Sequence, residues 1–272
     1  MSPQARSLGA LRLPAIAVAL AAAVLLAAPL IVVAATSVTE SAFLRIPPQG
    51  FTLDWYARVA GDPAWTGPFW LSVGVGAAAT GIAVLVGTLA AFAVERLSGG
   101  AARLVRGLLV MPLAVPPMAY AVGLVGMHRL LAPWRANLAV LILGEAVLAL
   151  PFVFVLVSAA LARLDPALPR AAATLGAGWG TVIGRIQLPL VVPAMAAGAV
   201  LAFSAAFDDV VLALLLLPAG TETLPVTLLG AAQEVLSPAL AAASTLVSVL
   251  AVAVLGLVSL LQARRSGRMV QS

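Results

Sequence analysis

Three carboxylates lie inside long apolar stretches of the sequence. Asp208 and Asp209 are adjacent within one apolar run, and Glu145 lies within another. A charge at membrane depth is costly, so such residues are by default candidates for a functional site. The three carboxylates are therefore predicted to line a substrate path, where they would attract an ammonium group during its passage.

Each carboxylate also has a structural interpretation. One aspartate could hydrogen-bond a neighbouring helix or cap a break in its own helix, and Glu145 could form a similar hydrogen bond. Adjacent residues of a helix point about 100° apart, so at most one of Asp208 and Asp209 is expected to face a given cavity. The sequence does not identify which one. Acidic residues without arginine in these stretches fit an anionic solute poorly.

The residues that catalysis or metal binding would need are nearly absent. The chain has no cysteine and a single histidine, and all its cationic residues are arginine. Without lysine it cannot form a Walker A loop, whose lysine binds phosphate. We expect no catalytic residue, no metal site and no bound cofactor. The arginines occur singly or in pairs beside apolar stretches, which does not indicate nucleic-acid binding.

The composition indicates how these residues are positioned. Of the 272 residues, 63% are hydrophobic and 9% are charged, too apolar a composition for a soluble domain. A bilayer core of about 30 Å needs roughly 20 apolar residues in a helix. We therefore predict an all-α polytopic membrane protein with six spans, at Pro14–Thr36, Phe69–Val94, Gly107–Met127, Leu138–Leu161, Val191–Leu217 and Pro238–Leu261.

The first span follows a short N-terminal segment, residues 1–13. Residues 14–36 are longer than the apolar region of a signal peptide, about 7 to 15 residues, so we expect an uncleaved span, although Val33-Ala34-Ala35 resembles a cleavage site. Residues 37–68 are predicted to form an external loop, with aromatic rings at the headgroup level. Residues 69–262 form the predicted core, and residues 263–272 a tail.

Arginine asymmetry predicts the orientation. Excess cationic residues in short loops stay cytoplasmic. With six spans, one side collects Arg6, Arg12, Arg96, Arg103, Arg106, Arg163, Arg170, Arg185, Arg264, Arg265 and Arg268, and the other collects Arg45, Arg58, Arg129 and Arg135. Both termini are therefore expected in the cytoplasm.

The longest internal cytoplasmic segment, about residues 165–189, is predicted to contain a short helix. Asp165 can cap its N-terminus, and Pro166 suits the first helical position. An alanine run favours the helix, and Gly176 is placed to end it with a left-handed residue. From these features alone the helix could be a plain connector between two spans.

The spacing of this segment is similar to a known loop. Arg170-Ala171-Ala172, three residues, Gly176, nine residues and Ile186-Gln187-Leu188-Pro189 resemble the EAA loop of ATP-binding-cassette (ABC) importer permeases, E-A-A-x3-G-x9-I-x-L-P. In that family the short helix docks into a groove of a cytoplasmic ATPase and transmits the closure of the ATPase to the membrane spans. The resemblance implies ATPase coupling for Asp165, Arg170, Ala171, Ala172, Gly176, Ile186, Leu188 and Pro189.

The sequence departs from the family pattern at Arg170, where the family usually has glutamate. This reversal of charge leaves the details of docking open. One interpretation is a partner ATPase with an acidic residue opposite Arg170.

A closer resemblance covers about Phe51 to Leu261. Phe51–Tyr56, Met111–Pro117, Val147–Phe152 and, most specifically, Phe203–Val210 are similar to the C-type permease of spermidine/putrescine importers. The resemblance implies the type I permease fold in a bacterial inner membrane and a polyamine as solute. The implied partners are an ATPase dimer carrying ATP and Mg, a second and paralogous permease, an external solute-binding protein and the lipid bilayer.

Three alternatives remain at this stage. A permease of the same architecture could carry an amino-acid-like compound, thiamine, iron or an oxyanion. An ion-driven secondary transporter could use the three carboxylates as proton or sodium sites. A membrane scaffold without transport activity would need none of them.

Overall fold

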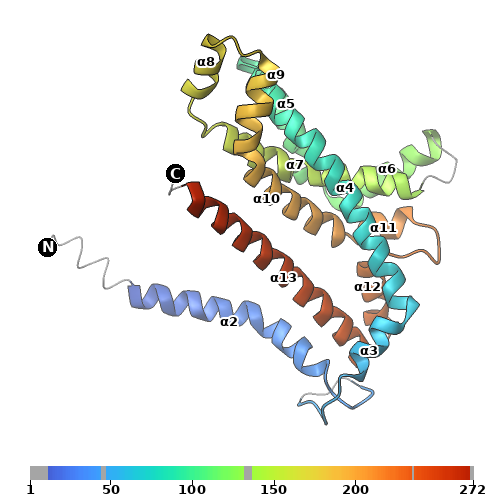
Figure 1. Ribbon diagram of the computed structural model, residues 1–272. Helices are drawn as coiled ribbons and strands as arrows, with labels where there is room; N and C mark the ends of the chain where they lie inside the picture. Colours follow the sequence, from blue (N-terminus) through green and yellow to red (C-terminus); the bar gives the residue numbers. More distant parts are fainter. Residues whose placement is uncertain (1–11, 44–46, 132–136, 235, 270–272) are drawn as a thin grey trace. The chain divides into compact units, whose positions relative to one another are not determined.

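The computed structural model describes residues 12–43, 47–131, 137–234 and 236–269, and within these ranges every regular element is helical (Figure 1). This confirms the predicted all-α class. The chain divides into two compact units. One comprises Met1–Thr66 and Leu228–Val254, and the other comprises Gly67–Thr227 and Leu255–Ser272.

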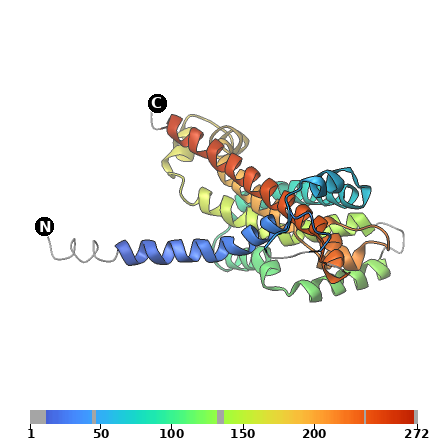
Figure 2. The ribbon, with the colours of Figure 1, turned by 90° about the horizontal axis from the view of Figure 1, so that it is seen from below.

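The first unit contains α2 (Arg12–Thr36), α3 (Asp54–Gly61) and the first part of α13 (Pro238–Met269). Figures 1 and 2 both draw α2 as one continuous helix. Its section Pro14–Thr36 is long and apolar enough to span a membrane, as predicted. No part of its most apolar stretch is buried within the chain.

The predicted loop at residues 37–68 is partly helical, because it contains α3 and the start of α4 (Pro63–Glu95). Its fold is fixed by hydrogen bonds: the indole Nε1–H of Trp55 donates to the carbonyl of Thr39 at 2.9 Å. Val59 of α3 packs in one cluster with Ala242 and Ala243 of α13. Tertiary packing therefore orders a segment that reads as loop in the sequence.

The second unit holds most of the helices that surround the candidate site. They are the rest of α4, α5 (Gly99–Val110), η1 (Met111–Ala114), α6 (Pro117–Leu131), α7 (Asn137–Leu161), α10 (Leu188–Phe207), α11 (Val211–Leu216) and the first turn of α12 (Leu224–Glu234).

Its core is built around α7 and α10, which lie side by side (Figure 1). Glycines allow this approach, because a Cβ at Gly198 of α10 would lie 2.9 Å from the Cα of Val153 in α7. A Cβ at Gly87 of α4 would lie 3.1 Å from the Cβ of the same valine. Small residues at such positions let helix backbones approach closely.

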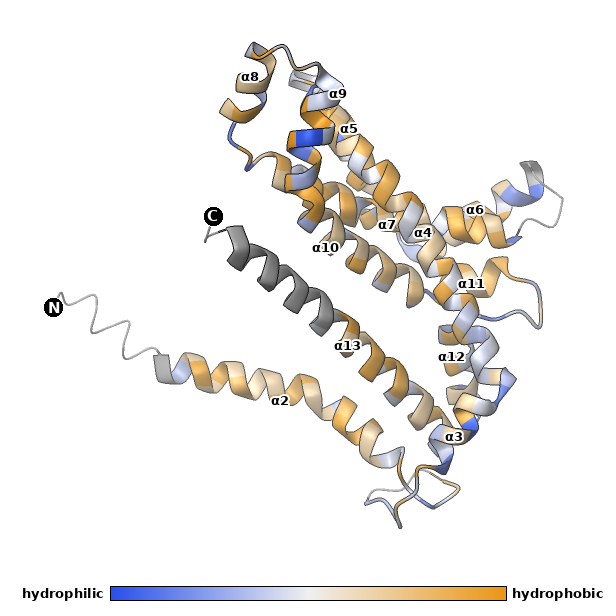
Figure 3. Cartoon of the chain, in the orientation of Figure 1, coloured by the Kyte–Doolittle hydropathy of each residue, from blue (hydrophilic) through white to orange (hydrophobic). Residues whose placement is uncertain are grey.

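Four helical stretches of the described residues are long and apolar enough to cross a membrane: Pro14–Thr36, Pro63–Glu95, Asn137–Leu161 and Trp179–Phe207. Figure 3 shows apolar residues along most of α2, α7 and α10. Pro238–Val254 is a shorter apolar helix. The predicted count of six spans therefore stays a prediction.

The predicted span Gly107–Met127 is not one straight helix. It is divided between α5 with η1 and α6, whose axes differ by 102°. The break lies at Val115 and Pro116, next to Pro117 at the start of α6. Proline lacks the amide that a helix interior needs and restricts the residue before it. The pair counts as one further span only if both halves cross together.

Candidate functional site

The predicted span Val191–Leu217 is also interrupted, and the interruption falls at the two aspartates. Helix α10 ends at Phe207, and α11 begins at Val211. Asp208 is the residue directly after α10, and its amide donates to the carbonyl of Ser204 at 3.2 Å. The expectation that Asp208 and Asp209 occupy adjacent positions of one helix is therefore wrong, because both lie in the connection between two helices.

Asp209 caps the second of these helices. Its Oδ1 accepts the amide hydrogen of Leu212 at 2.7 Å. The first amides of a helix have no partner within the helix, so a carboxylate at this place stabilises the first turn. Leu212 is itself fully buried in the core of the second unit. This is the structural role that the sequence left open for one of the aspartates.

Glu145 of α7 is buried, with 3% of its surface exposed. Its side chain interacts with that of Asp209, where α7 packs against α11. Tyr120 of α6 lies beside it, since its hydroxyl donates to the carbonyl of Gly144 at 3.3 Å. The structure thus brings Glu145 and Asp209 together, with Tyr120 as a neighbour that the sequence did not single out.

Asp208 differs from both of these carboxylates, because it is exposed. The residue before it in the chain is aromatic: Phe207 stacks on Phe203 with ring centroids 5.6 Å apart. Phe207 also meets Phe69 of α4 edge to face at 6.4 Å. The exposed carboxylate therefore follows directly on an aromatic cluster, which combines two kinds of group that attract cations.

The short helix predicted near residue 165 is present as α8 (Ala167–Thr174). Asp165 Oδ1 accepts the amide hydrogen of Ala167 at 2.8 Å, which confirms the predicted cap. Gly176 has φ +81°, and its amide donates to the carbonyl of Ala173 at 3.0 Å. Such a left-handed glycine is a common helix end. Arg170, Ala171 and Ala172 lie within α8.

The remaining residues of the motif lie where this segment enters the core. α9 (Trp179–Val182) and the π-helical turn η2 (Ile183–Gln187) continue into α10. Ile186 lies in η2, and Leu188 and Pro189 begin α10. The same helix that receives the α8 segment therefore ends at Asp208.

Among the described residues, no group of three or more His, Cys, Asp or Glu side chains could hold a metal ion. The site offers instead an exposed carboxylate, a pair of carboxyl groups of which Glu145 is buried, and a helix that joins them to α8.

Comparison with known proteins identifies the architecture. Residues 83–270 match the family described as "Binding-protein-dependent transport system inner membrane component". The chain belongs to this family. It is a permease of the ABC type, which is a membrane channel subunit and not an enzyme. The family implies a cytoplasmic ATPase and a solute-binding protein as partners in general terms, and the apolar helices fit a multi-pass membrane protein.

Named relatives carry the resemblance further. The permease is 31% identical to the spermidine/putrescine transport system permease protein PotC of Escherichia coli K12, over 82% of this chain and 83% of that protein. It is 29% identical to the putrescine transport system permease protein PotI of the same strain, over 73% of each. The molybdenum transport system permease protein ModB of Mycobacterium bovis is 33% identical over 51% of this chain and 57% of its own length.

A solved structure supports the fold. A chain in the crystal structure of a bacterial ABC transporter involved in the import of the acidic polysaccharide alginate superposes with a TM-score of 0.73 at 16% identity. The match covers 96% of each chain.

Proposed function

We propose that the permease forms part of the translocation path for a small cationic solute, a polyamine such as spermidine or putrescine, in an ATP-driven importer of a bacterial inner membrane. Two of its relatives are named for these solutes, at 31% and 29% identity. The single observation that carries the proposal is the exposed carboxylate of Asp208 at the end of α10.

The three carboxylates take different roles in this proposal. Asp209 caps α11 and interacts with the buried Glu145, so both position the connection between α10 and α11. Asp208 remains available to a solute, next to the stacked rings of Phe207 and Phe203. A polyamine carries ammonium groups separated by methylene chains, and these groups fit a carboxylate beside aromatic surfaces.

Coupling to ATP hydrolysis enters from the other end of α10. In the proposed assembly the permease pairs with a second, paralogous permease, an ATPase dimer and an external solute-binding protein, with both termini cytoplasmic. Helix α8 docks onto the ATPase, and next to Gly176 the side chain of Leu175 is 88% exposed and apolar. Closure of the ATPase on ATP moves α8, and η2 and α10 carry the displacement to Asp208. Hydrolysis resets the assembly.

A second candidate solute is an oxyanion, because ModB is named for molybdenum and is 33% identical over 150 residues. The exposed carboxylate of Asp208 disfavours it, since like charges repel where water is scarce. The two candidates differ in the sign of the solute charge, which makes them easy to separate.

The test is uptake by proteoliposomes that contain the permease, its partner permease, the ATPase and the binding protein. We expect saturable, ATP-dependent accumulation of labelled putrescine or spermidine that excess molybdate does not inhibit. Accumulation of molybdate in place of polyamine would overturn the proposed solute. Uptake that persists with an ATPase unable to hydrolyse ATP, driven by an ion gradient, would overturn the ABC mechanism.

A further inference from the structure

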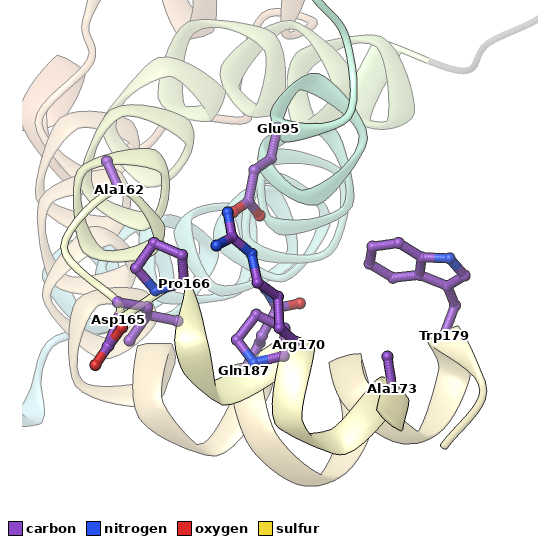
Figure 4. Close-up of a pocket in the computed structure, with 10 residues that line it drawn as sticks. Glu95, Ala162, Asp165, Pro166, Arg170, Ala173, Trp179 and Gln187 are labelled. Atoms are coloured by element: carbon purple, nitrogen blue, oxygen red, sulfur yellow. The ribbon is translucent and has the colours of Figure 1, made fainter. Parts of the chain in front are cut away.

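A cavity lies between α8, α9 and the end of α4 (Figure 4). Its volume is about 410 Å³, and its lining includes Glu95, Asp165, Arg170, Trp179 and Gln187. Glu95 is the last residue of α4. The end of α4 therefore faces the coupling segment across a shared polar space.

Arg170 points into this cavity toward Glu95 (Figure 4). It occupies the position at which the EAA pattern has glutamate. If its partner were an acidic residue of the ATPase, the side chain would be expected to turn away from its own chain. Instead it is directed toward a carboxylate of the same chain on the other side of the cavity, and opposite charges attract.

The residue after Glu95 contacts the same segment directly. The guanidinium of Arg96 lies 4.3 Å from the ring centroid of Trp179 at the start of α9. This distance is within the range of a cation–π interaction. Of these two consecutive residues, Glu95 thus faces Arg170 of α8 across the cavity, and Arg96 contacts Trp179 of α9.

We propose that Glu95 and Arg96 hold the coupling segment to α4, and that Glu95, rather than an acidic residue of the ATPase, is the electrostatic partner of Arg170. We call these four residues, Glu95, Arg96, Arg170 and Trp179, the α4 clasp. They are positioning residues. This inference rests on the proposed docking of α8 to the ATPase, because the clasp then passes the movement of α8 to α4 as well as to α10.

The exposure of the clasp suits a contact that must change during each transport cycle. Glu95, Arg96 and Arg170 are all exposed, and attraction between exposed opposite charges contributes little to stability. A weak contact of this kind biases the position of the segment without locking it. Buried Gln187, with 6% of its surface exposed, lines the same cavity and lies at the junction with α10.

The first test is a charge-reversal cycle in the complete reconstituted complex. Arg170→Glu and Glu95→Arg each place like charges across the cavity, and we expect uptake per ATP hydrolysed to fall about fivefold in each. The double variant restores the opposite pair and is expected to recover most of this loss. Arg103→Glu, at an exposed position of α5 outside the cavity lining, makes the same change of charge and should leave uptake unchanged.

The result that overturns the clasp is a double variant no better than Arg170→Glu alone. That outcome is what an acidic partner on the ATPase predicts, since Glu95→Arg cannot compensate there. Arg170→Glu that behaves as wild type would also overturn the clasp, because it would show that the charge opposite Glu95 has no effect.

A second readout does not depend on transport. The chain has no cysteine, so Gln187→Cys places a single thiol at the buried lining of the cavity. We expect a thiol reagent to label it about fivefold faster in either single reversal and at the original rate in the double variant. No difference among the variants would overturn the clasp. A return to the original labelling rate in the double variant, in complexes that show no ATP-driven uptake, would instead support the clasp and refute the proposed function.

Discussion

The acidic and basic residues near the two ends of α10 differ in burial. At the end near α11, Glu145 is buried and interacts with Asp209, which also caps α11. At the other end, Arg170 and Glu95 are exposed on either side of a cavity. A buried polar group needs a fixed hydrogen-bond partner because leaving it unpaired is costly, whereas exposed charges exchange partners at little cost. One end is therefore suited to hold a site in place, and the other to move.

The largest expected effect lies between the two ends. If α10 joins them as a rigid link, its close contact with α7 should matter most. Gly198→Ala places a Cβ 2.9 Å from the Cα of Val153, and overpacking of this kind costs about 1–3 kcal/mol. We expect a lower thermal unfolding midpoint of the purified permease and weaker uptake per ATP.

The matched control for this change is Gly107→Ala in α5. A Cβ at Gly107 meets nothing within 4 Å, so stability should be unchanged or slightly higher, because alanine favours a helix more than glycine. Equal destabilisation by both substitutions would show that the α7–α10 contact is not specifically tight.

The end of α10 near α11, the fixed end, depends on the cap that Asp209 provides. Asp209→Ala removes the oxygen that accepts the amide of Leu212, and loss of such a cap costs about 1–2 kcal/mol. Asp209→Ser keeps an oxygen that can accept the hydrogen bond, and should lose much less. Thermal unfolding of the two variants compares them directly. The structural role of Asp209 would be contradicted if alanine and serine had the same midpoint as wild type.

The end of α10 near α8, the end proposed to move, can be tested by straining the backbone at Gly176, which lies outside the core. Gly176 has φ +81°, where a side chain costs about 1–2 kcal/mol. Gly176→Ala should therefore loosen α8 and lower uptake per ATP while the unfolding midpoint hardly moves. Gly178→Ala is the control, because Gly178 has φ −71°. A similar loss of uptake in both variants would mean that the left-handed turn is not what matters.

The sequence predicted the segment around α8 better than the connection between α10 and α11. Asp165 and Gly176 act through local rules of helix capping, which depend on neighbours in the chain. The prolines near residue 116 explain the break in the predicted span Gly107–Met127 by similarly local rules, although not its angle of 102°.

The fixed end depends on contacts between distant segments. Asp208 and Asp209 have different roles because Asp209 binds the amide of Leu212 and interacts with Glu145 on another helix. The apolar residues on both sides of the aspartates gave no sign that α10 stops at Phe207. Helix α3 was missed for the same reason, because its packing onto α13 decides its conformation. The aromatic cluster beside Asp208 also emerged only in the fold.

The central claim is that the exposed aspartate contacts the solute while its neighbour holds the structure. The most direct measurement is ATP-driven putrescine uptake by reconstituted complexes that carry Asp208→Asn or Asp209→Asn, together with the amount of assembled complex. Loss of one charge–charge contact with the solute should lower uptake by Asp208→Asn about tenfold or more with assembly intact. Asp209→Asn, which keeps an oxygen for capping, should retain most of its uptake. Full uptake by Asp208→Asn would contradict the account.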